Sequence, residues 1–257
     1  MNLNKVVIVL DGLVPLNFAE DWDNVGLLVS SKNIKINKIL LTIDLTKNVL
    51  EEAIKSKSNL IISYHPFLFN PINRINYYYD KNRILTNLLK NDIAVYSPHT
   101  ALDNIENGVN YWLSKSMGEG KIETIFSSKT SLPCAKLVTL KKAKNINFIS
   151  KKLKDYLNLK YLRVAAIPNK KIRRIAFCAG SGSDVLKNIN ADCYVTGEMS
   201  HHNILKANSK GTHVILSEHT HTERGFLKIY KKMINSVLEA NIKVSISKFD
   251  KDPIKLI

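Results

Sequence analysis

The stretch KILLTIDLTKNVLEEAIKSKSNLIIS, residues 38–63, decides the fold class, because it reads as a strand, a helix and a second strand. Residues 38–44 are a continuous apolar run, typical of a buried strand. Thr46 has the side chain of an N-cap, so we predict a helix from Thr46 to Lys57. Residues 60–63 form the second apolar run. This order predicts a β–α–β unit.

The same alternation extends along the chain in both directions. We predict further strands at residues 93–96, 135–140, 161–166, 172–178, 192–196 and 212–216. We predict further helices at residues 82–90, 109–115, 146–156, 200–208 and 222–238. Residues 118–133 carry Gly, Ser, Thr and Pro without a period, which indicates a boundary. The prediction is therefore an α/β protein whose sheets are flanked by helices, with one lobe at 1–125 and a second at 126–257.

Composition places the chain among ordinary globular proteins. It has 257 residues, of which 45% are hydrophobic and 23% charged. No apolar run reaches about 18 residues, so no membrane span is predicted. The opening MNLNKVVIVLDGL is interrupted by Asp11 and is not expected to be a signal peptide. The three cysteines lack CxxC spacing, which indicates reduced thiols in an intracellular compartment and excludes a finger-type zinc site.

The chain is strongly basic, with 38 Lys and Arg against 22 Asp and Glu and a formal net charge of +16. This charge fits an anionic partner such as nucleic acid, a nucleotide or an acidic surface. The competing explanation is compositional drift, since only six of the basic residues are arginine and the lysines are scattered. Arginine is the residue that reads bases and clamps phosphates. The composition therefore does not favour nucleic acid as the partner.

Polar side chains that bind metals follow three of the predicted strands. The three loops are residues 63–66 with His65, residues 99–103 with His99 and Asp103, and residues 217–224 with His219 and Glu223. Ligands in open α/β folds bind beyond the carboxyl ends of strands, so these loops can converge. Imidazole and carboxylate are the usual ligands of Zn, Mn and Fe. The alternative is that each histidine is a hydrogen-bonded structural residue.

Two local arrangements add weaker indications. His219 and Glu223 are four residues apart and would share a helix face if the helix predicted at 222–238 began early. Gly180, Ser181 and Gly182 lie between a strand and a helix, where backbone amides can bind phosphate. This run is neither a P-loop nor a full dinucleotide fingerprint, so a tight structural turn is the alternative to a phosphate site.

Six long motifs, taken together and in order, resemble those of the GTP cyclohydrolase I type 2 (Nif-three-like) family. They span nearly the whole chain, and their SYHP and SPHTA wording is similar to the eukaryotic branch. The motifs are PLNFAEDWDNVGLLV from Pro15, ISYHPFLF from Ile62, YSPHTALDN from Tyr96, CAGSGSDVL from Cys178, ADCYVTGEMSHH from Ala191 and SEHTHTERGFLK from Ser217.

The resemblance implies two related α/β lobes, a ring-like homo-oligomer that is often a hexamer, and a site for two divalent transition metals (Zn, Mn or Fe) per subunit. The implied metal ligands are His65, Asp103, His219 and Glu223, with the 217–224 motif of the second lobe returning to the metal site. Bacterial members usually carry two adjacent histidines where this chain has Tyr64-His65. That replacement puts one metal in doubt, unless Tyr64, His99 or His221 compensates.

The implied activity is metal-dependent hydrolysis of a carbon–nitrogen bond, as in opening the imidazole ring of GTP. Glu223 is the implied bridging carboxylate, and Glu223 or His99 would move protons. Nothing in the sequence identifies guanine recognition, so the substrate is expected only to be nucleotide-like or a small molecule. The alternative is a metal-binding regulatory protein with a transcription-related partner. The expected compartment is the cytoplasm, with the nucleus as a second location.

Overall fold

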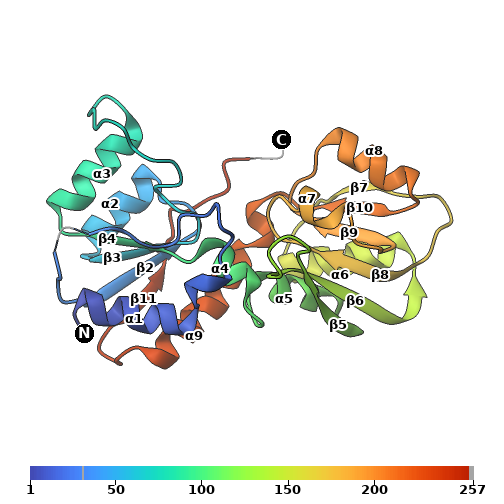
Figure 1. The fold of residues 1–257 in the computed structure, drawn as a ribbon, viewed down its shortest axis with the longest axis horizontal. Coiled ribbons are helices and arrows are strands. Elements are labelled where there is room, and N and C mark those ends of the chain that lie inside the picture. The colour runs from blue at the N-terminus through green and yellow to red at the C-terminus, as the bar shows by residue number, and fades with distance from the viewer. Residues whose placement is uncertain (31, 255–257) are drawn as a thin grey trace. The chain divides into compact units, whose positions relative to one another are not determined.

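The computed structural model describes residues 1–30 and 32–254, and these form two compact units (Figure 1). The first unit contains residues 1–102 together with the C-terminal segment that starts at Leu227. The second unit contains residues 103–226. Each unit has its own sheet, covered by its own helices, which confirms the α/β class predicted from the alternating pattern.

The first unit is built on a five-stranded, mostly parallel sheet in the order β1-β4-β3-β2-β11. Strands β2, β3, β4 and β11 are parallel, and β1 joins the edge of β4 antiparallel. The strand bounds are β1 Gly26–Val29, β2 Lys38–Thr42, β3 Leu60–Ser63, β4 Ala94–Ser97 and β11 Lys243–Ile246. The order β2, α2, β3 confirms the β–α–β unit expected from residues 38–63.

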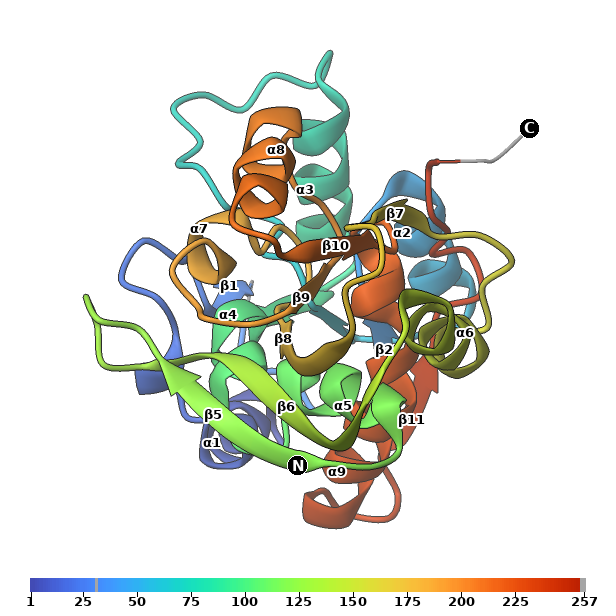
Figure 2. The ribbon, with the colours of Figure 1, turned by 90° about the vertical axis from the view of Figure 1, so that its right-hand side faces the viewer.

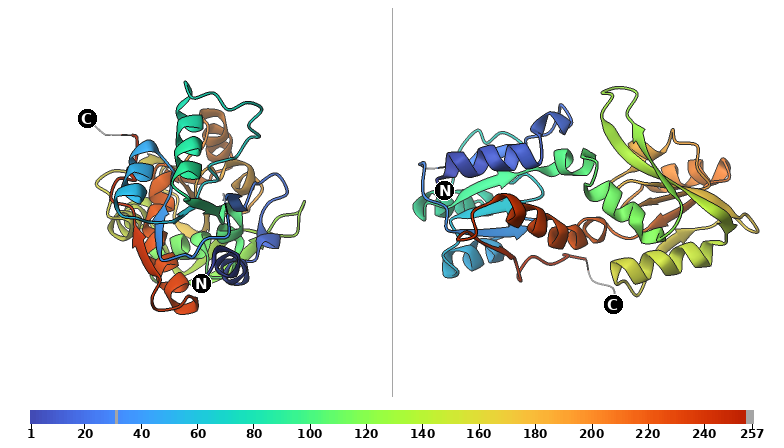
Figure 3. Two further views of the ribbon diagram at one scale, coloured as in Figure 1. Left: turned by 90° about the vertical axis from the view of Figure 1, so that its left-hand side faces the viewer. Right: turned by 90° about the horizontal axis from the view of Figure 1, so that it is seen from below.

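Helices cover both faces of this sheet (Figures 1 and 3). Helices α2 and α3 pack on one face, where Leu40, Ile61 and Val95 from successive strands meet Val49 and Leu88. Helices α1 and α9 lie on the opposite face. Burial on both faces explains why these strands are continuously apolar. The bounds are α1 Leu3–Leu13, η1 Leu16–Phe18, α2 Lys47–Lys55, α3 Asp80–Lys90 and α9 Leu227–Val237.

A local sequence signal marks the start of helix α2, whereas helix α1 was harder to recognise. The Thr46 hydroxyl accepts a hydrogen bond from the amide of Val49, so Thr46 is the N-cap predicted for α2. Helix α1 was not predicted, because Asp11 interrupts its apolar run. The helix nevertheless buries Leu3, Val6 and Leu10 along one face, and Asp11 accepts a 2.8 Å hydrogen bond from the Tyr96 hydroxyl.

The second unit contains a six-stranded mixed sheet in the order β5-β6-β8-β9-β10-β7. Its central strands β8, β9 and β10 are parallel, whereas β5, β6 and β7 pair antiparallel. Figure 2 shows β5 and β6 as a long hairpin along one side. The bounds are β5 Lys121–Phe126, β6 Pro133–Lys144, β7 Arg163–Ala165, β8 Ile172–Phe177, β9 Cys193–Thr196 and β10 His213–Leu216.

Helices α7 and α8 cover one face of the second sheet, and α5 and α6 cover the other (Figure 2). Under α7 and α8, Ala176, Tyr194 and Val214 from the parallel strands meet Leu186 and Ala207. The bounds are α4 His99–Asn104, α5 Val109–Ser114, η2 Lys115–Met117, α6 Ile146–Leu157, α7 Ser183–Leu186, α8 His201–Ser209, η3 Thr220–Thr222 and η4 Arg224–Phe226. None of the described helices is long and apolar enough to cross a membrane.

Two expectations differ from this architecture. The lobes were predicted as 1–125 and 126–257, whereas the units divide after Leu102 and after Phe226. The reason is that residues 118–133 contain β5, whose pairing with β6 holds this segment inside the second sheet. The helix predicted at 222–238 begins only at Leu227, because 3-10 turns occupy residues 220–222 and 224–226.

Candidate functional site

In the first unit, the carboxyl ends of three adjacent parallel strands carry polar side chains. Asp44 follows β2, His65 follows β3 and His99 follows β4. Thr42 and Ser63 are partners at the ends of β2 and β3, so the residues that follow them leave the sheet side by side. This is the edge at which ligands bind in open α/β sheets.

His65 is fixed by an acid and by two aromatic neighbours. Its Nδ1 atom lies 2.9 Å from Oδ1 of Asp44. Its ring contacts those of Tyr64 and His99, with centroid distances of 5.0 and 5.4 Å. Tyr64 is buried and also packs edge-on against His99 at 5.6 Å. The Tyr64 ring therefore packs against both imidazoles.

His99 is held by a more deeply buried acid. Its Nδ1 atom lies 2.8 Å from Oδ1 of Asp23, and the Asp23 side chain has no exposed surface. The Thr100 amide and hydroxyl donate to the other Asp23 oxygen at 3.1 and 2.5 Å. Burial alone would raise the pKa of Asp23, but the hydrogen bond and charge of His99 and the Thr100 hydrogen bonds lower that pKa overall.

The second unit repeats this arrangement at the ends of its own parallel strands. The turn at residues 178–183 follows β8, Glu198 comes just after β9, and His219 comes just after β10. Nδ1 of His219 lies 3.1 Å from Oε1 of Glu198. His219 is therefore positioned by a carboxylate in the same way as His65 and His99.

Glu223 adds a second donor next to His219. Oε1 of Glu223 lies 3.2 Å from Nε2 of His219, and the Glu223 side chain is only 3% exposed. The two residues were expected to share a helix face, but the turn between them is a 3-10 helix, η3. Donors held about 2.0–2.1 Å from one zinc ion stand roughly 3 Å apart, so this pair fits a metal ion.

The glycine turn at residues 180–182 packs directly beneath this pair. A Cβ atom on Gly180 would lie 2.8 Å from Oε1 of Glu223 and 3.1 Å from Nε2 of His219, and its φ is +61°. Its amide donates to the Thr222 hydroxyl at 2.8 Å, and the Gly182 amide donates to the Thr196 hydroxyl at 2.9 Å. Neither amide is available to a phosphate. The two glycines instead allow the turn to pack closely against its neighbours.

Unusual backbone conformations occur at both strand ends. His99 has a φ of +29° and Glu218 a φ of +65°, values that side chains other than glycine rarely adopt. Glu218 is tied to Nε of Arg163 at 2.8 Å. Residues held in such conformations are common at functional sites. Five other described non-glycine residues also have positive φ, so the backbone alone does not single out these two loops.

In the second unit, His219 and Glu223 together offer donor atoms that could hold a metal ion, and in the first unit His65 offers an imidazole donor. Of the other predicted residues, Asp103 lies one turn after His99 in α4. Nδ1 of His221 lies 2.9 Å from the carbonyl of Ser217.

Sequence reasoning missed the three carboxylates that position the histidines, namely Asp44, Asp23 and Glu198. Asp44 ends the apolar run 38–44, and Asp23 and Glu198 lie in two of the six family motifs. For Asp44 and Glu198, an acid placed just after a strand end was the available signal, whereas Asp23 lies in the loop before β1 and offered no such signal.

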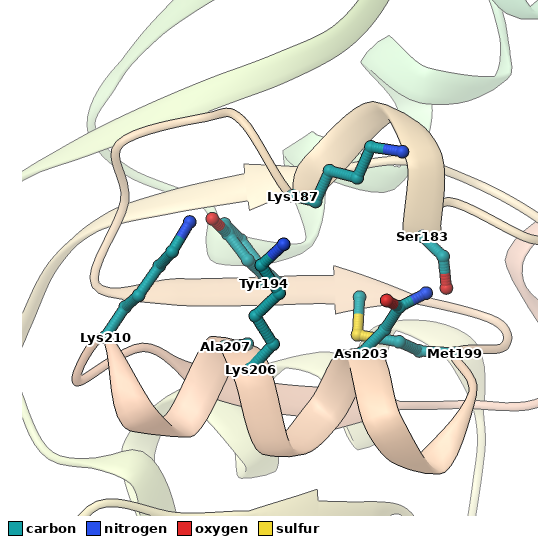
Figure 4. A pocket seen from close by; sticks show the side chains of 8 residues that line it. All are labelled: Ser183, Lys187, Tyr194, Met199, Asn203, Lys206, Ala207 and Lys210. Carbon is teal, nitrogen blue, oxygen red and sulfur yellow. The ribbon is translucent and has the colours of Figure 1, made fainter.

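A small depression elsewhere in the second unit is separate from these loops. Lys187, Lys206 and Lys210 surround Tyr194 there, between α7 and α8 (Figure 4). Its volume is about 10 Å³, room for about one water molecule. Lys187 is also paired with Asp184 at 2.6 Å, and the Tyr194 hydroxyl donates to the carbonyl of Ile189. The depression is therefore too small to be a substrate site.

Comparison with known proteins settles the family. Residues 1–253 match the family model described as Duf34/NIF3 (NGG1p interacting factor 3). The chain belongs to this family. NIF3-like protein 1 of Drosophila melanogaster is 39% identical over 258 residues, covering 98% of this chain and 88% of that protein. The NGG1-interacting factor 3 of Saccharomyces cerevisiae is 35% identical over 278 residues, covering 98% and 96%.

Solved structures agree with the family assignment. The crystal structure of Staphylococcus aureus protein SA1388 matches with a TM-score of 0.87 and 25% identity, covering 100% of this chain and 99% of that one. The Nif-three-like resemblance and its fold, both expected from the six motifs, are therefore confirmed for this NIF3-family chain.

Proposed function

We propose that this chain is a metal-dependent hydrolase. The proposed ligands are His65, Asp103, His219 and Glu223, and the proposed metals are Zn, Mn or Fe, with up to about two ions per chain. The proposed substrate is a nucleotide-like or other small molecule. We further propose that the chain acts as a ring-shaped homo-oligomer, a hexamer in the first instance, in the cytoplasm or nucleus.

The observation that carries this proposal is a repeated pairing of histidine with carboxylate. His65, His99 and His219 each have Nδ1 within 3.1 Å of an acid, which leaves Nε2 as the atom directed elsewhere. Metal-ligating histidines almost always carry such a partner on the second nitrogen, because it fixes the ring and raises its basicity. A purely structural role would not require the same device on three histidines at strand ends.

The donor set fits a hard or borderline divalent ion. Glu223 and His219 supply one carboxylate and one imidazole 3.2 Å apart, and His65 is proposed to supply a second imidazole. When bound there, a metal would polarise a substrate oxygen and lower the pKa of a water molecule. Asp103 would complete the set with a second carboxylate. Tyr64 occupies a buried place beside His65 and is proposed as a support, with His221 as the substitute ligand.

His99 is proposed to move protons at this site. Asp23 holds its Nδ1 atom, so Nε2 is the nitrogen that can donate or accept a proton at a substrate. Because Asp23 is buried and ionised, it stabilises the protonated imidazole that forms during transfer. Glu223, which is also buried, is proposed to take the second proton-transfer role.

Metal analysis of purified variants tests the proposal. We expect about one or two transition-metal ions per wild-type chain and a large loss in His65→Ala and in Glu223→Ala. His202→Ala and Glu119→Ala remove an exposed histidine and an exposed acid elsewhere and should keep the metal. A screen for hydrolysis, starting with GTP, would follow on the metal-loaded protein. A wild-type chain that takes up no Zn, Mn or Fe would sink the hydrolase proposal.

The two single variants also test the ligands separately. If Glu223→Ala loses the metal while His65→Ala keeps it, His65 is not a ligand. In that case this part of the proposed ligand set is wrong, although a metal protein remains.

A regulatory role in binding a protein partner is the second candidate. It is favoured by the yeast relative, which is named as an NGG1-interacting factor. This candidate predicts partner binding that survives removal of the metal with a chelator. It also predicts that His65→Ala and Glu223→Ala keep the partner, which the hydrolase proposal does not require.

A further inference from the structure

We propose that the first unit binds a planar heteroaromatic ring in a pocket beside the Asp23–His99 pair. The pocket has a volume of about 530 Å³ and lies at the connection between β3 and α3. That volume is within the range of about 300–1,000 Å³ found for small-molecule sites. Its walls are mainly apolar, including Leu68, Phe69, Ile72 and Leu85. The inference rests on the proposed function only where it identifies the ring as part of a substrate.

Two aromatic side chains next to the pocket stay open to solvent. Trp22 is 61% exposed and Phe69 is 45% exposed. Their ring centroids are 6.0 Å apart with an interplanar angle of 62°, an edge-to-face arrangement. Such a pair does not use all of its ring faces, so a further ring can stack on either side chain. Large exposed aromatic groups at a pocket are a typical feature of a binding site.

The aromatic contacts continue from the pocket to the proton-transfer residue. Trp22 contacts His99 edge-on, with ring centroids 6.1 Å apart and an interplanar angle of 78°. The three rings Phe69, Trp22 and His99 therefore form a row that starts at the pocket. A ligand ring stacked on Trp22 would lie within one ring of His99, where a substrate has to be presented.

Polar groups in the pocket favour a ring with heteroatoms over a pure hydrocarbon. Asn24 and Asn70 both line the pocket, and an amide side chain offers donors and an acceptor in one plane. The Asn24 amide also donates to the carbonyl of Leu68, which fixes the loop that forms the wall. Ring nitrogens and exocyclic groups at the edge of a heteroaromatic ring match such amides.

Tryptophan fluorescence tests this pocket directly, because the chain has only two tryptophans and Trp112, in the second unit, is just 9% exposed. Metal-free protein would be titrated with AMP, with GMP and with ribose 5-phosphate, which has the sugar and phosphate but no heteroaromatic base. We expect saturable quenching by AMP, GMP or both, and none by ribose 5-phosphate.

Variants then assign the signal to the pocket, with affinities measured by calorimetry. Phe69→Leu should weaken nucleotide binding at least about fivefold, the low end of what one stacking partner contributes. Trp22→Leu should weaken it by a similar factor and remove the quenching. Tyr78→Leu is the matched control, since Tyr78 is an 88% exposed aromatic residue outside the pocket lining, and it should bind as wild type.

Four results would overturn the inference: no saturable quenching by either nucleotide, an equal response to ribose 5-phosphate, quenching that persists in Trp22→Leu, or unchanged nucleotide affinity in Phe69→Leu. Trp22 emission that changes with protein concentration alone would also overturn it, because a second copy would then be covering the pocket. Because the titration uses metal-free protein, nucleotide binding can be detected even if the metal-loaded protein hydrolyses nothing. Likewise, hydrolysis can be detected even if no nucleotide binds in this pocket. The two proposals can therefore fail independently.

Discussion

Nδ1 of His99 lies 2.8 Å from Oδ1 of Asp23, a carboxylate that has no exposed side-chain surface and receives two further hydrogen bonds from Thr100. These two residues are 76 positions apart in the chain. The pair combines a buried carboxylate with an imidazole whose Nδ1 atom is held by that carboxylate, so that Nε2 is the nitrogen proposed to exchange protons. It therefore contributes both to the stability of the first unit and to the chemistry proposed for it.

Replacing Asp23 by Asn should destabilise the protein. The amide keeps the shape of the side chain but loses the negative charge and replaces one of the two accepting oxygens by an NH2 group that cannot accept. We expect the free energy of unfolding to fall by about 2–3 kcal/mol in urea titrations. Asp21→Asn, at a neighbouring exposed acid, should change it by no more than about 0.5 kcal/mol. Equal effects of both changes would contradict a buried role for Asp23.

Removing the acids that orient the proposed ligands should weaken metal binding without deleting a ligand. Asp44→Asn and Glu198→Gln each remove the negative charge of the partner on Nδ1 of a histidine. We expect each to lower metal affinity by about 10–100-fold in competition titrations with a coloured chelator. Asp184→Asn, at an exposed acid of α7, serves as the control. Wild-type affinity in both variants would argue against the histidine–carboxylate interpretation.

A methyl group at Gly180 should disturb the donors above it. In Gly180→Ala, the added Cβ would meet Oε1 of Glu223 at 2.8 Å in a backbone conformation with φ of +61°. We expect lower stability by about 1–3 kcal/mol and loss of metal affinity. Gly12→Ala is the matched change, since no atom lies within 4 Å of its added Cβ in α1. That variant should be about 0.5–1 kcal/mol more stable than wild type.

Acid should destabilise the second unit through His213. This imidazole is fully buried on β10, and its Nδ1 atom accepts a hydrogen bond from the Ile167 amide at 3.1 Å. Burial lowers the pKa of His213 from its ordinary value of 6.5. Below pH 6.5 the histidine binds a proton in the unfolded chain but stays neutral in the folded protein. The free energy of unfolding therefore decreases as pH falls.

Urea titrations at pH 7.5 and 5.5 check this expectation. The loss of stability should approach about 1.4 kcal/mol per pH unit until the pH reaches the pKa of the folded protein. His213→Gln removes the titrating group and should flatten this dependence, whereas His202→Gln, at an exposed histidine, should leave it unchanged. A His213→Gln protein with the full dependence would show that another group is responsible.

The fold could be predicted where local patterns act alone. The apolar runs that became β2 and β3 are continuous because both sheet faces are covered, and Thr46 marked the start of α2. The histidines at strand ends were found for the same reason, since strand ends are visible in sequence. Helix α1 was missed because Asp11 interrupts its apolar run, although the buried residues Leu3, Val6 and Leu10 recur at helical spacing.

The remaining features depend on contacts between distant residues. Asp23 meets His99 only because the loop before β1 and the end of β4 come together, and β1 pairs with β4 across a long interval of sequence. The unit boundary was misplaced because the polar segment 118–133 looked like a linker. Its strand β5 is held by antiparallel pairing with β6, which local composition does not reveal.

The order of the chain within the first unit has a consequence for biosynthesis. Strand β2 pairs on one side with β11, and α9 packs against the same sheet, yet both come from the last part of the chain. Residues 103–226 are continuous and contain every strand of their own sheet. During translation the second unit can therefore fold first, while the nascent first unit keeps a partly uncovered sheet face and an unpaired strand edge until the ribosome releases α9 and β11.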